Sequence, residues 1–134
     1  MGASEIFSIS PVTDLRCLND SFTYIAKNYI APMGFLDVWT KLYIGNSDPG
    51  MPLLLPQMVD YTGLPPLHMC VGTNEIHLDD CGSVARKAKE QGVDVTLRKR
   101  PRMVHAFATL SPLFPEAENA MLEIWEFAKS HVKL

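Results

Sequence analysis

The stretch that decides the fold opens with Leu67-His68-Met69-Cys70-Val71-Gly72, a short and nearly all-apolar run that directly follows two prolines. A run of this kind predicts a strand covered on both faces, as strands in parallel sheets are. A helix is expected after it, capped by Asp79 or Asp80 and ended by Gly92. Residues 93–97 then alternate between apolar and polar side chains, which predicts a second strand. Strand, helix and strand in this order predict a right-handed βαβ unit with parallel strands.

Upstream of this unit, the pattern predicts one more strand and two helices. Residues 5–10 alternate well enough for a strand that stops at Pro11, whose missing N–H suits a strand end. Apolar residues spaced by three and four predict a helix over residues 15–30 and a shorter one over residues 35–42. Residues 51–66 contain four prolines and are expected to form an ordered loop.

Downstream of the unit, the chain is expected to form a loop over residues 101–114 and then a last helix that begins at Pro115-Glu116. The spacing of apolar residues predicts the buried stripe of this helix, which consists of Ala117, Ala120, Met121, Ile124, Phe127 and Ala128. The predicted fold class is therefore α/β, with parallel strands and flanking helices.

The composition excludes several classes of protein. The chain has 134 residues, of which 47% are hydrophobic and 20% are charged, as in a globular domain. A formal net charge of −3 argues against nucleic-acid binding, and the basic residues within 98–102 have no aromatic residues between them. Three cysteines without C-x-x-C spacing argue against a disulfide framework and a structural zinc site, so a reducing, cytoplasmic setting is expected. No apolar run reaches membrane-spanning length, and no transmembrane segment is expected.

Chemistry is expected at the carboxyl ends of the predicted strands, because the functional groups of open parallel sheets gather there. Glu75 follows the first strand of the βαβ unit, and His105 follows the second. Adjacent parallel strands bring these loops together, and a carboxylate can then fix the tautomer of an imidazole whose other nitrogen acts as a general base. The residues alone leave an alternative open, in which Glu75 is solvated, Asp79 caps a helix and His105 is a half-buried loop residue.

The other histidines, His68, His77 and His131, are expected to be structural or exposed. A metal site built from His77, Asp79 and Asp80 is weakly supported, because the spacing matches no specific ligand pattern. Neither a metal nor a cofactor is therefore expected.

Several segments, in this order, resemble the hormone-sensitive-lipase-like branch of the α/β-hydrolases. They cover nearly the whole chain and are Ser10-Pro11-Val12-Thr13-Asp14-Leu15, Tyr43-Ile44-Gly45 with Asp48-Pro49, Gly63-Leu64-Pro65-Pro66 with Val71-Gly72, Glu75-Ile76-His77-Leu78-Asp79-Asp80 and Met103-Val104-His105-Ala106-Phe107. The resemblance implies that residues 1–134 are the C-terminal portion of an α/β-hydrolase domain. Within it, residues 18–43 correspond to part of a helical cap, and residues 67–134 form the unit that bears the acid and the histidine.

The same resemblance implies a carboxylic ester hydrolase, of the esterase or lipase kind, that works by Ser–acid–His acyl transfer on an ester with an acyl chain. It implies that His105 is the catalytic base and Glu75 the catalytic acid. Asp79 matches a second acidic position, which supports the loop or serves as the alternative acid. Ile76 and Phe107 are expected to line the substrate pocket.

One departure from the family pattern concerns the nucleophile. The 134 residues contain neither a glycine-x-serine-x-glycine segment nor a histidine-glycine-glycine segment. We therefore expect the chain to supply the acid and the histidine, to lack the serine, and to be inactive alone. The missing serine half would then come from a longer parent protein or from a separate, complementing N-terminal chain. The alternative is a truncated, catalytically inactive module that oligomerises or binds a partner chain.

Overall fold

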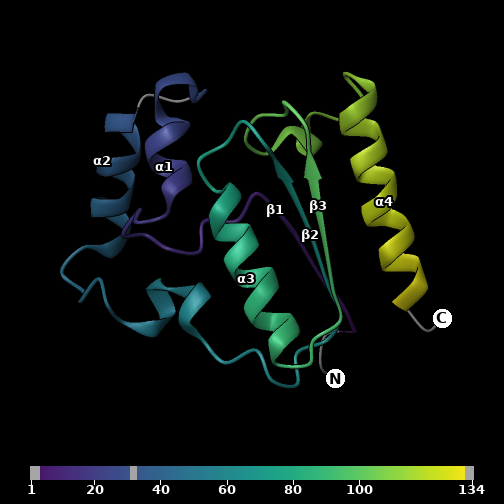
Figure 1. Ribbon diagram of the computed structural model, residues 1–134, viewed down its shortest axis with the longest axis horizontal. Coiled ribbons are helices and arrows are strands. Elements are labelled where there is room, and N and C mark those ends of the chain that lie inside the picture. Colours follow the sequence, from purple (N-terminus) through teal and green to yellow (C-terminus); the bar gives the residue numbers. More distant parts are fainter. Residues whose placement is uncertain (1–3, 31–32, 132–134) are drawn as a thin grey trace.

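The computed structural model describes residues 4–30 and 33–131 and contains a parallel sheet of three strands in the order β1-β2-β3 (Figure 1). The strands are β1 (Ile6–Ile9), β2 (Leu67–Gly72) and β3 (Val95–Arg100). Helix α3 (Leu78–Glu90) covers one face of the sheet, and helix α4 (Pro115–His131) covers the other (Figure 1). The α/β fold class and the parallel βαβ unit predicted from the sequence are confirmed.

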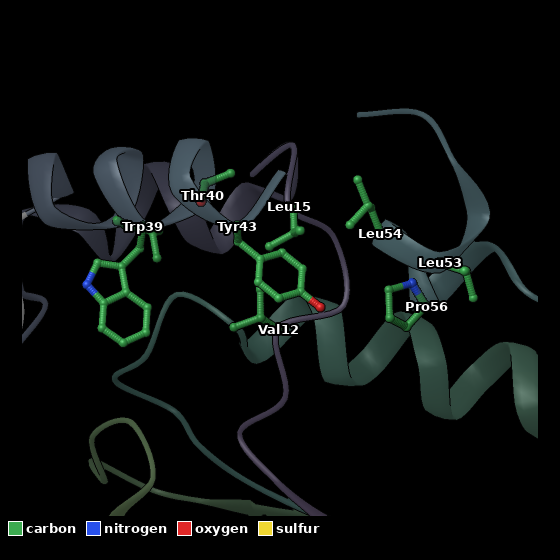
Figure 2. A pocket seen from close by; sticks show the side chains of 9 residues that line it. Val12, Leu15, Trp39, Thr40, Tyr43, Leu53, Leu54 and Pro56 are labelled. Carbon is green, nitrogen blue, oxygen red and sulfur yellow. The ribbon is translucent and has the colours of Figure 1, made fainter. Parts of the chain in front are cut away.

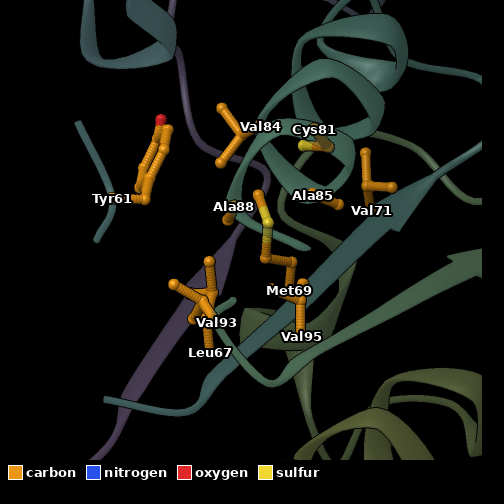
Figure 3. Close-up of a cluster of buried hydrophobic side chains, with 10 residues drawn as sticks. All are labelled: Tyr61, Leu67, Met69, Val71, Cys81, Val84, Ala85, Ala88, Val93 and Val95. Atoms are coloured by element: carbon orange, nitrogen blue, oxygen red, sulfur yellow. The ribbon is translucent and has the colours of Figure 1, made fainter. Parts of the chain in front are cut away.

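Strand β2 lies in the middle of the sheet and is buried at every residue, which explains its nearly all-apolar sequence. Met69 and Val71 belong to the core between the sheet and α3, whereas Cys70 packs on the opposite face against the start of α4. Figure 3 shows the first of these cores, which consists of Tyr61, Leu67, Met69, Val71, Cys81, Val84, Ala85, Ala88, Val93 and Val95.

The start of α3 differs from the prediction. The helix begins at Leu78, and Asp79 and Asp80 lie within its first turn rather than at the capping position. His77 occupies that position without a side-chain capping bond. Asp80 accepts the N–H of Thr13 in the segment before α1, and Asp79 accepts the N–H of Ser21 in the first turn of α1. The predicted end is confirmed, since Gly92 follows the helix with a φ of +85°, a conformation that favours glycine.

Strand β3 extends from Val95 to Arg100, so the predicted range of 93–97 is wrong at both ends. The polar tail Arg98-Lys99-Arg100 does not alternate in hydrophobicity, yet it pairs in parallel register with Cys70-Val71-Gly72. Backbone hydrogen bonds to β2 therefore extend the strand beyond its apolar part. At the other edge of the sheet, β1 stops at Ile9 because Ser10 adopts a left-handed φ of 47°.

The helix predicted over residues 15–30 is not formed. The structure has only the short α1 (Asp20–Tyr24) and a 3-10 turn at Ala26–Asn28. The Asp14 side chain accepts the backbone N–H of Arg16 and pairs with its guanidinium, and Cys17 then has a φ of 55°. These local bonds form a turn in place of the first helical turns.

The second predicted helix is longer than expected, since α2 extends over Met33–Ile44 rather than over residues 35–42. The proline-rich stretch 51–66 is irregular, as predicted, and contains two 3-10 turns at Pro52–Leu54 and Pro56–Met58. The loop expected over residues 101–114 likewise contains a 3-10 turn, Phe107–Leu110. None of the helices within residues 4–30 and 33–131 is long and apolar enough to cross a membrane.

Helix α4 begins at Pro115 as predicted, but only part of its predicted stripe is buried. Ala117, Ala120 and Ile124 face the sheet at spacings of three and four residues. Met121 lies one residue further round the helix and is 36% exposed, so its expected burial was wrong. Phe127 and Ala128 are half-buried.

Candidate active site

Two loops meet at the carboxyl end of the sheet and bring an acid and a histidine together. Glu75 lies in the turn after β2, and His105 lies in the loop after β3. The Nδ1 atom of His105 is 2.9 Å from Oε2 of Glu75, a hydrogen-bonding distance. The Glu75 side chain is fully buried, whereas that of His105 is 33% exposed. A buried carboxylate thus faces an imidazole that remains accessible.

The second oxygen of Glu75 is also occupied. Its Oε1 atom accepts hydrogen bonds from the Ser10 hydroxyl, at 2.7 Å, and from the Gly72 backbone N–H, at 2.6 Å. Both oxygens of this buried carboxylate therefore have partners, as a buried acid requires. Ser10 is itself buried and bonded to the acid, so it is not placed as an accessible nucleophile.

The loop that carries His105 packs closely on the end of β2. A Cβ atom added to Gly72 would lie 2.1 Å from the Met103 carbonyl oxygen, so only glycine allows this approach. The Asn74 N–H donates to the same oxygen at 3.0 Å. Ala106, with a left-handed φ of 54°, donates its N–H to the Ser10 hydroxyl at 3.0 Å. Backbone contacts therefore fix the loop on both sides of His105.

Two aromatic rings pack beside the imidazole of His105. The His77 ring centroid lies 5.3 Å away, and that of Tyr29 lies 6.3 Å away. Burial, together with the charge of Glu75, raises the pKa of Tyr29 to about 12, so its hydroxyl stays protonated at neutral pH. His77 is buried rather than exposed, with Nδ1 at 3.6 Å from Asp80 Oδ2, and its ring packs against the site.

The structure places Asp79 away from the imidazole. Its Oδ2 accepts the backbone N–H of Ser21 at 2.8 Å, and its own N–H donates to the Ser21 hydroxyl at 3.3 Å. Asp80 accepts the N–H of Thr13 at 3.3 Å and a bond from the Asn19 amide. The two aspartates thus tie the segment between β1 and α1 to α3, and Glu75 is the acid that reaches His105.

The two residues expected to line a substrate pocket are both fully buried. Ile76 packs with Phe22 and Ile25, and Phe107 packs in the core cluster that includes Cys70, beneath α4. Neither presents surface to a bound molecule in this arrangement. Both side chains are core residues here, and their contact with a substrate stays a prediction.

An apolar pocket of about 250 Å³ lies elsewhere, between α2 and the loops around it (Figure 2). Its walls include Trp39 and Tyr43 from α2 and Leu53 and Leu54 from the 3-10 turn that follows. Glu75 and His105 do not line it. The pocket is therefore a feature of the segment after β1 and is separate from the acid–histidine pair.

The cysteines and acidic groups offer no competing centre. Burial raises the pKa of Cys17 and of Cys70 to about 11 each, and it raises that of Cys81 further, so all three remain thiols at neutral pH. Among residues 4–30 and 33–131, no three His, Cys, Asp or Glu side chains are grouped so that they could hold a metal ion.

Sequence reasoning missed the bridging role of Ser10. The residue was part of the segment that resembles the hydrolase family, but its position next to Glu75 depends on the parallel pairing of β1 with β2. The two residues are 65 positions apart in the chain, so spacing alone could not bring them together.

Known proteins similar to this chain are α/β-hydrolases and esterases. Residues 3–109 match the model of a family described as having the alpha/beta hydrolase fold. An acetyl-hydrolase of Streptomyces hygroscopicus is 34% identical over 84% of this chain and 38% of its own length. An esterase of Acinetobacter venetianus is 33% identical over 95% of the chain and 43% of its own length. The chain thus spans less than half of these curated relatives.

Solved structures give the same result. A hormone-sensitive lipase from a metagenome library superposes with a TM-score of 0.90 at 28% identity, over 96% of this chain and 45% of its own. An esterase from the bacterial hormone-sensitive lipase family gives a TM-score of 0.91 at 31% identity, over 97% of this chain and 44% of its own.

Proposed function

The chain belongs to the α/β-hydrolase family, in its hormone-sensitive-lipase-like branch, and we propose that it carries the acid and the base of a carboxylic ester hydrolase. In this proposal, Glu75 is the acid and His105 the base. The observation that carries it is the 2.9 Å contact between a fully buried carboxylate and an accessible imidazole. The substrate class is an ester with an acyl chain, in keeping with the acetyl-hydrolase and esterase among the relatives.

The proposed mechanism is acyl transfer through a serine. Glu75 accepts the Nδ1–H of His105, which fixes the tautomer with a free electron pair on Nε2. Nε2 takes the proton of the serine hydroxyl as its oxygen attacks the ester carbonyl, and it gives that proton to the departing alcohol. In the second half of the cycle, Nε2 takes a proton from water, which attacks the acyl-serine, and returns it to the serine. The Glu75 charge stabilises the imidazolium in both halves.

The nucleophile in this proposal comes from residues other than these 134. The sequence contains no glycine-x-serine-x-glycine segment, and the chain matches only 43% of the length of the Acinetobacter esterase. Because the serine and the oxyanion donors supply most of the rate enhancement in such enzymes, we expect the 134 residues alone to hydrolyse esters at a near-background rate.

A chimera tests the proposal. This chain would replace the matching part of the Acinetobacter esterase, which keeps its own upstream residues, and hydrolysis of p-nitrophenyl butyrate would be measured. We expect activity in the chimera and a loss of roughly a thousandfold or more with His105→Ala, as for removal of a triad base. The matched control is His131→Ala, which removes a histidine from the last turn of α4 and leaves the rate unchanged. Hydrolysis that survives His105→Ala contradicts the proposal.

Exposed apolar surface favours a second function, that of a partner-binding module. Phe35, Trp39 and Leu42 of α2 are all more than half exposed, and so is Phe7 on β1, a strand that pairs only with β2 among the described residues. Such surface is typical of a protein that associates. Sedimentation of the 134-residue chain tests this function: a dimer or larger species supports it, and a stable monomer at high concentration contradicts self-association.

A further inference from the structure

One buried hydroxyl joins the two parts of the acid–histidine pair. We propose that Ser10 is a positioning residue, whose hydroxyl holds the Glu75 carboxylate and the His105 loop in a single arrangement. The inference rests on the proposed roles of Glu75 and His105 and adds to them a third residue, which directly follows strand β1.

The geometry uses both hydrogen-bonding capacities of the hydroxyl. Its proton goes to Glu75 Oε1 at 2.7 Å, and its oxygen accepts the Ala106 N–H at 3.0 Å. Ser10 is 3% exposed, so water has no room to take over either bond. The Ser10 backbone N–H donates to the Cys70 carbonyl at 2.9 Å, which anchors the residue to β2. The hydroxyl therefore connects the loops after β2 and β3 from a fixed point at the end of β1.

Backbone conformation at both ends of this link supports a specific role. Ser10 has a φ of 47° and Ala106 a φ of 54°, and neither is glycine. A left-handed conformation costs a residue with a Cβ atom on the order of 1 kcal/mol. Two such residues are joined by one hydrogen bond, from the Ala106 N–H to the Ser10 hydroxyl. Strain of this kind is typical of functional sites.

The link determines which oxygen of Glu75 is available to His105. Oε1 is occupied by the Ser10 hydroxyl and the Gly72 N–H, so Oε2 is left to accept the Nδ1–H of His105. Without the hydroxyl, the carboxylate loses one of the two donors that fix its rotation, and the loop at Ala106 loses a tie to β1. Because the His105 ring is partly exposed, water then competes for its Nδ1–H.

Two substitutions separate positioning from stability. Ser10→Ala removes the hydroxyl and retains the strained φ, whereas Ser10→Gly removes the hydroxyl and relieves the strain. Ser10→Gly is therefore expected to stay folded even if Ser10→Ala does not. Ser21→Ala is the matched control, because the Ser21 hydroxyl is also buried and also bridges two groups, the Ile76 carbonyl and the Asp79 N–H, without touching Glu75.

The readout is the nuclear magnetic resonance spectrum of the 134-residue chain labelled with ¹⁵N in its histidines. We expect His105 to carry its proton on Nδ1, protected from exchange with water. Ser10→Gly should speed that exchange by about tenfold, the equivalent of one net hydrogen bond, or mix the two tautomers. Ser21→Ala should leave the His105 signals unchanged.

Two results would overturn the inference: unchanged His105 signals in Ser10→Gly, or an equal change in Ser21→Ala. Glu75→Gln separates this failure from failure of the proposed function. If Glu75→Gln alters the His105 tautomer and Ser10→Gly does not, only the role of Ser10 is wrong. If Glu75→Gln also leaves the tautomer unchanged, the acid–base pair is wrong, and the role of Ser10 is lost with it.

Discussion

Two regions of the molecule differ in how far their apolar side chains are buried. The first is the unit formed by residues 67–131, and the second is the predicted cap segment, residues 18–43. In the first region, every residue of β2 is buried and the inner face of α3 is closed against the sheet. In the second, Trp39 on α2 is 66% exposed, and Phe35 and Tyr43 are similarly open. The first region, called the closed region below, buries a core between the sheet and α3 to which Tyr61 also contributes, although Leu113 and Trp125 on its surface are exposed. Helix α2 in the second region leaves most of its large apolar side chains uncovered by the described residues.

The difference shows what the acid–histidine pair depends on. Glu75 and His105 both lie in loops of the closed region, held by Gly72, Met103 and the end of β1. The predicted cap segment contacts that region in two ways. The Ser21 hydroxyl donates to the Ile76 carbonyl and accepts the Asp79 N–H, and a small apolar cluster forms around Ile76. Disturbing the closed region should therefore damage stability and the site together, and disturbing α2 should damage neither.

The largest expected contrast is between two large side chains. Met69→Ala opens a cavity between the sheet and α3, where Met69 is 1% exposed, and should lower the free energy of unfolding by about 2–5 kcal/mol. Trp39→Ala removes an exposed ring and should change it by less than about 0.5 kcal/mol. Urea denaturation of both variants measures the difference. Equal losses would mean that α2 is as tightly packed as the sheet.

Replacing each of two glycines by alanine should change the free energy of unfolding in opposite directions. Gly72→Ala forces a methyl group to within 2.1 Å of the Met103 carbonyl oxygen and should cost about 1–3 kcal/mol while moving the His105 loop. Gly34→Ala in α2 meets nothing within 4 Å and should raise the free energy of unfolding by up to about 1 kcal/mol through helix propensity. Thermal unfolding of the two variants tests this. A neutral Gly72→Ala would contradict the close packing of the loop.

The buried imidazole of His68 should have a smaller effect on the free energy of unfolding, and that effect depends on pH. Among the described residues, neither ring nitrogen of His68 has a hydrogen-bond partner. Burial beneath α4 is the main cause that lowers its pKa below the ordinary 6.5, and Arg98 and Arg100 lower it further, against the opposing charge of Glu123. Below pH 6.5, His68 binds a proton in the unfolded chain but not in the folded chain. The free energy of unfolding is therefore greatest above pH 6.5 and falls as the pH drops toward the lowered pKa of His68 in the folded chain.

His68→Leu removes this proton uptake and should also raise stability at pH 7 by about 1 kcal/mol, because an unpaired polar group is lost. The free energy of unfolding measured between pH 7 and pH 5 should then lose its decline below pH 6.5, whereas His131→Ala should retain it. A decline that is the same in His68→Leu as in the parent chain would assign the effect to another group.

The same two regions show where sequence reasoning succeeds. The strand at 67–72 was predictable because it is apolar on both faces, and the helix after it because its inward-facing residues recur with helical spacing. The helix expected over 15–30 was not formed, because Asp14 bonds the N–H of Arg16 and Asp79 accepts the N–H of Ser21. Hydrogen bonds from side chains to the backbone compete with helix formation, and the spacing of apolar residues does not reveal them.

Some features of the acid–histidine site could likewise be predicted from the sequence, and others could not. Topology made a meeting of Glu75 and His105 possible, because their loops lie at the same edge of a parallel sheet, and the family resemblance selected these two residues. The exact partners of the carboxylate do not follow, because they depend on register and on left-handed turns at Ser10 and Ala106. Neither serine nor alanine favours a positive φ, so the sequence carries no signal for these two turns.

We propose that Glu75, rather than Asp79, is the acid that serves His105, and the chimera with the Acinetobacter esterase distinguishes the two. The measurement is kcat for p-nitrophenyl butyrate in Glu75→Gln and Asp79→Asn, each of which removes one negative charge at nearly constant shape. We expect a loss of roughly a thousandfold or more for Glu75→Gln, since the tautomer of His105 is no longer held, and a loss of less than about tenfold for Asp79→Asn. A larger loss in Asp79→Asn than in Glu75→Gln would contradict it.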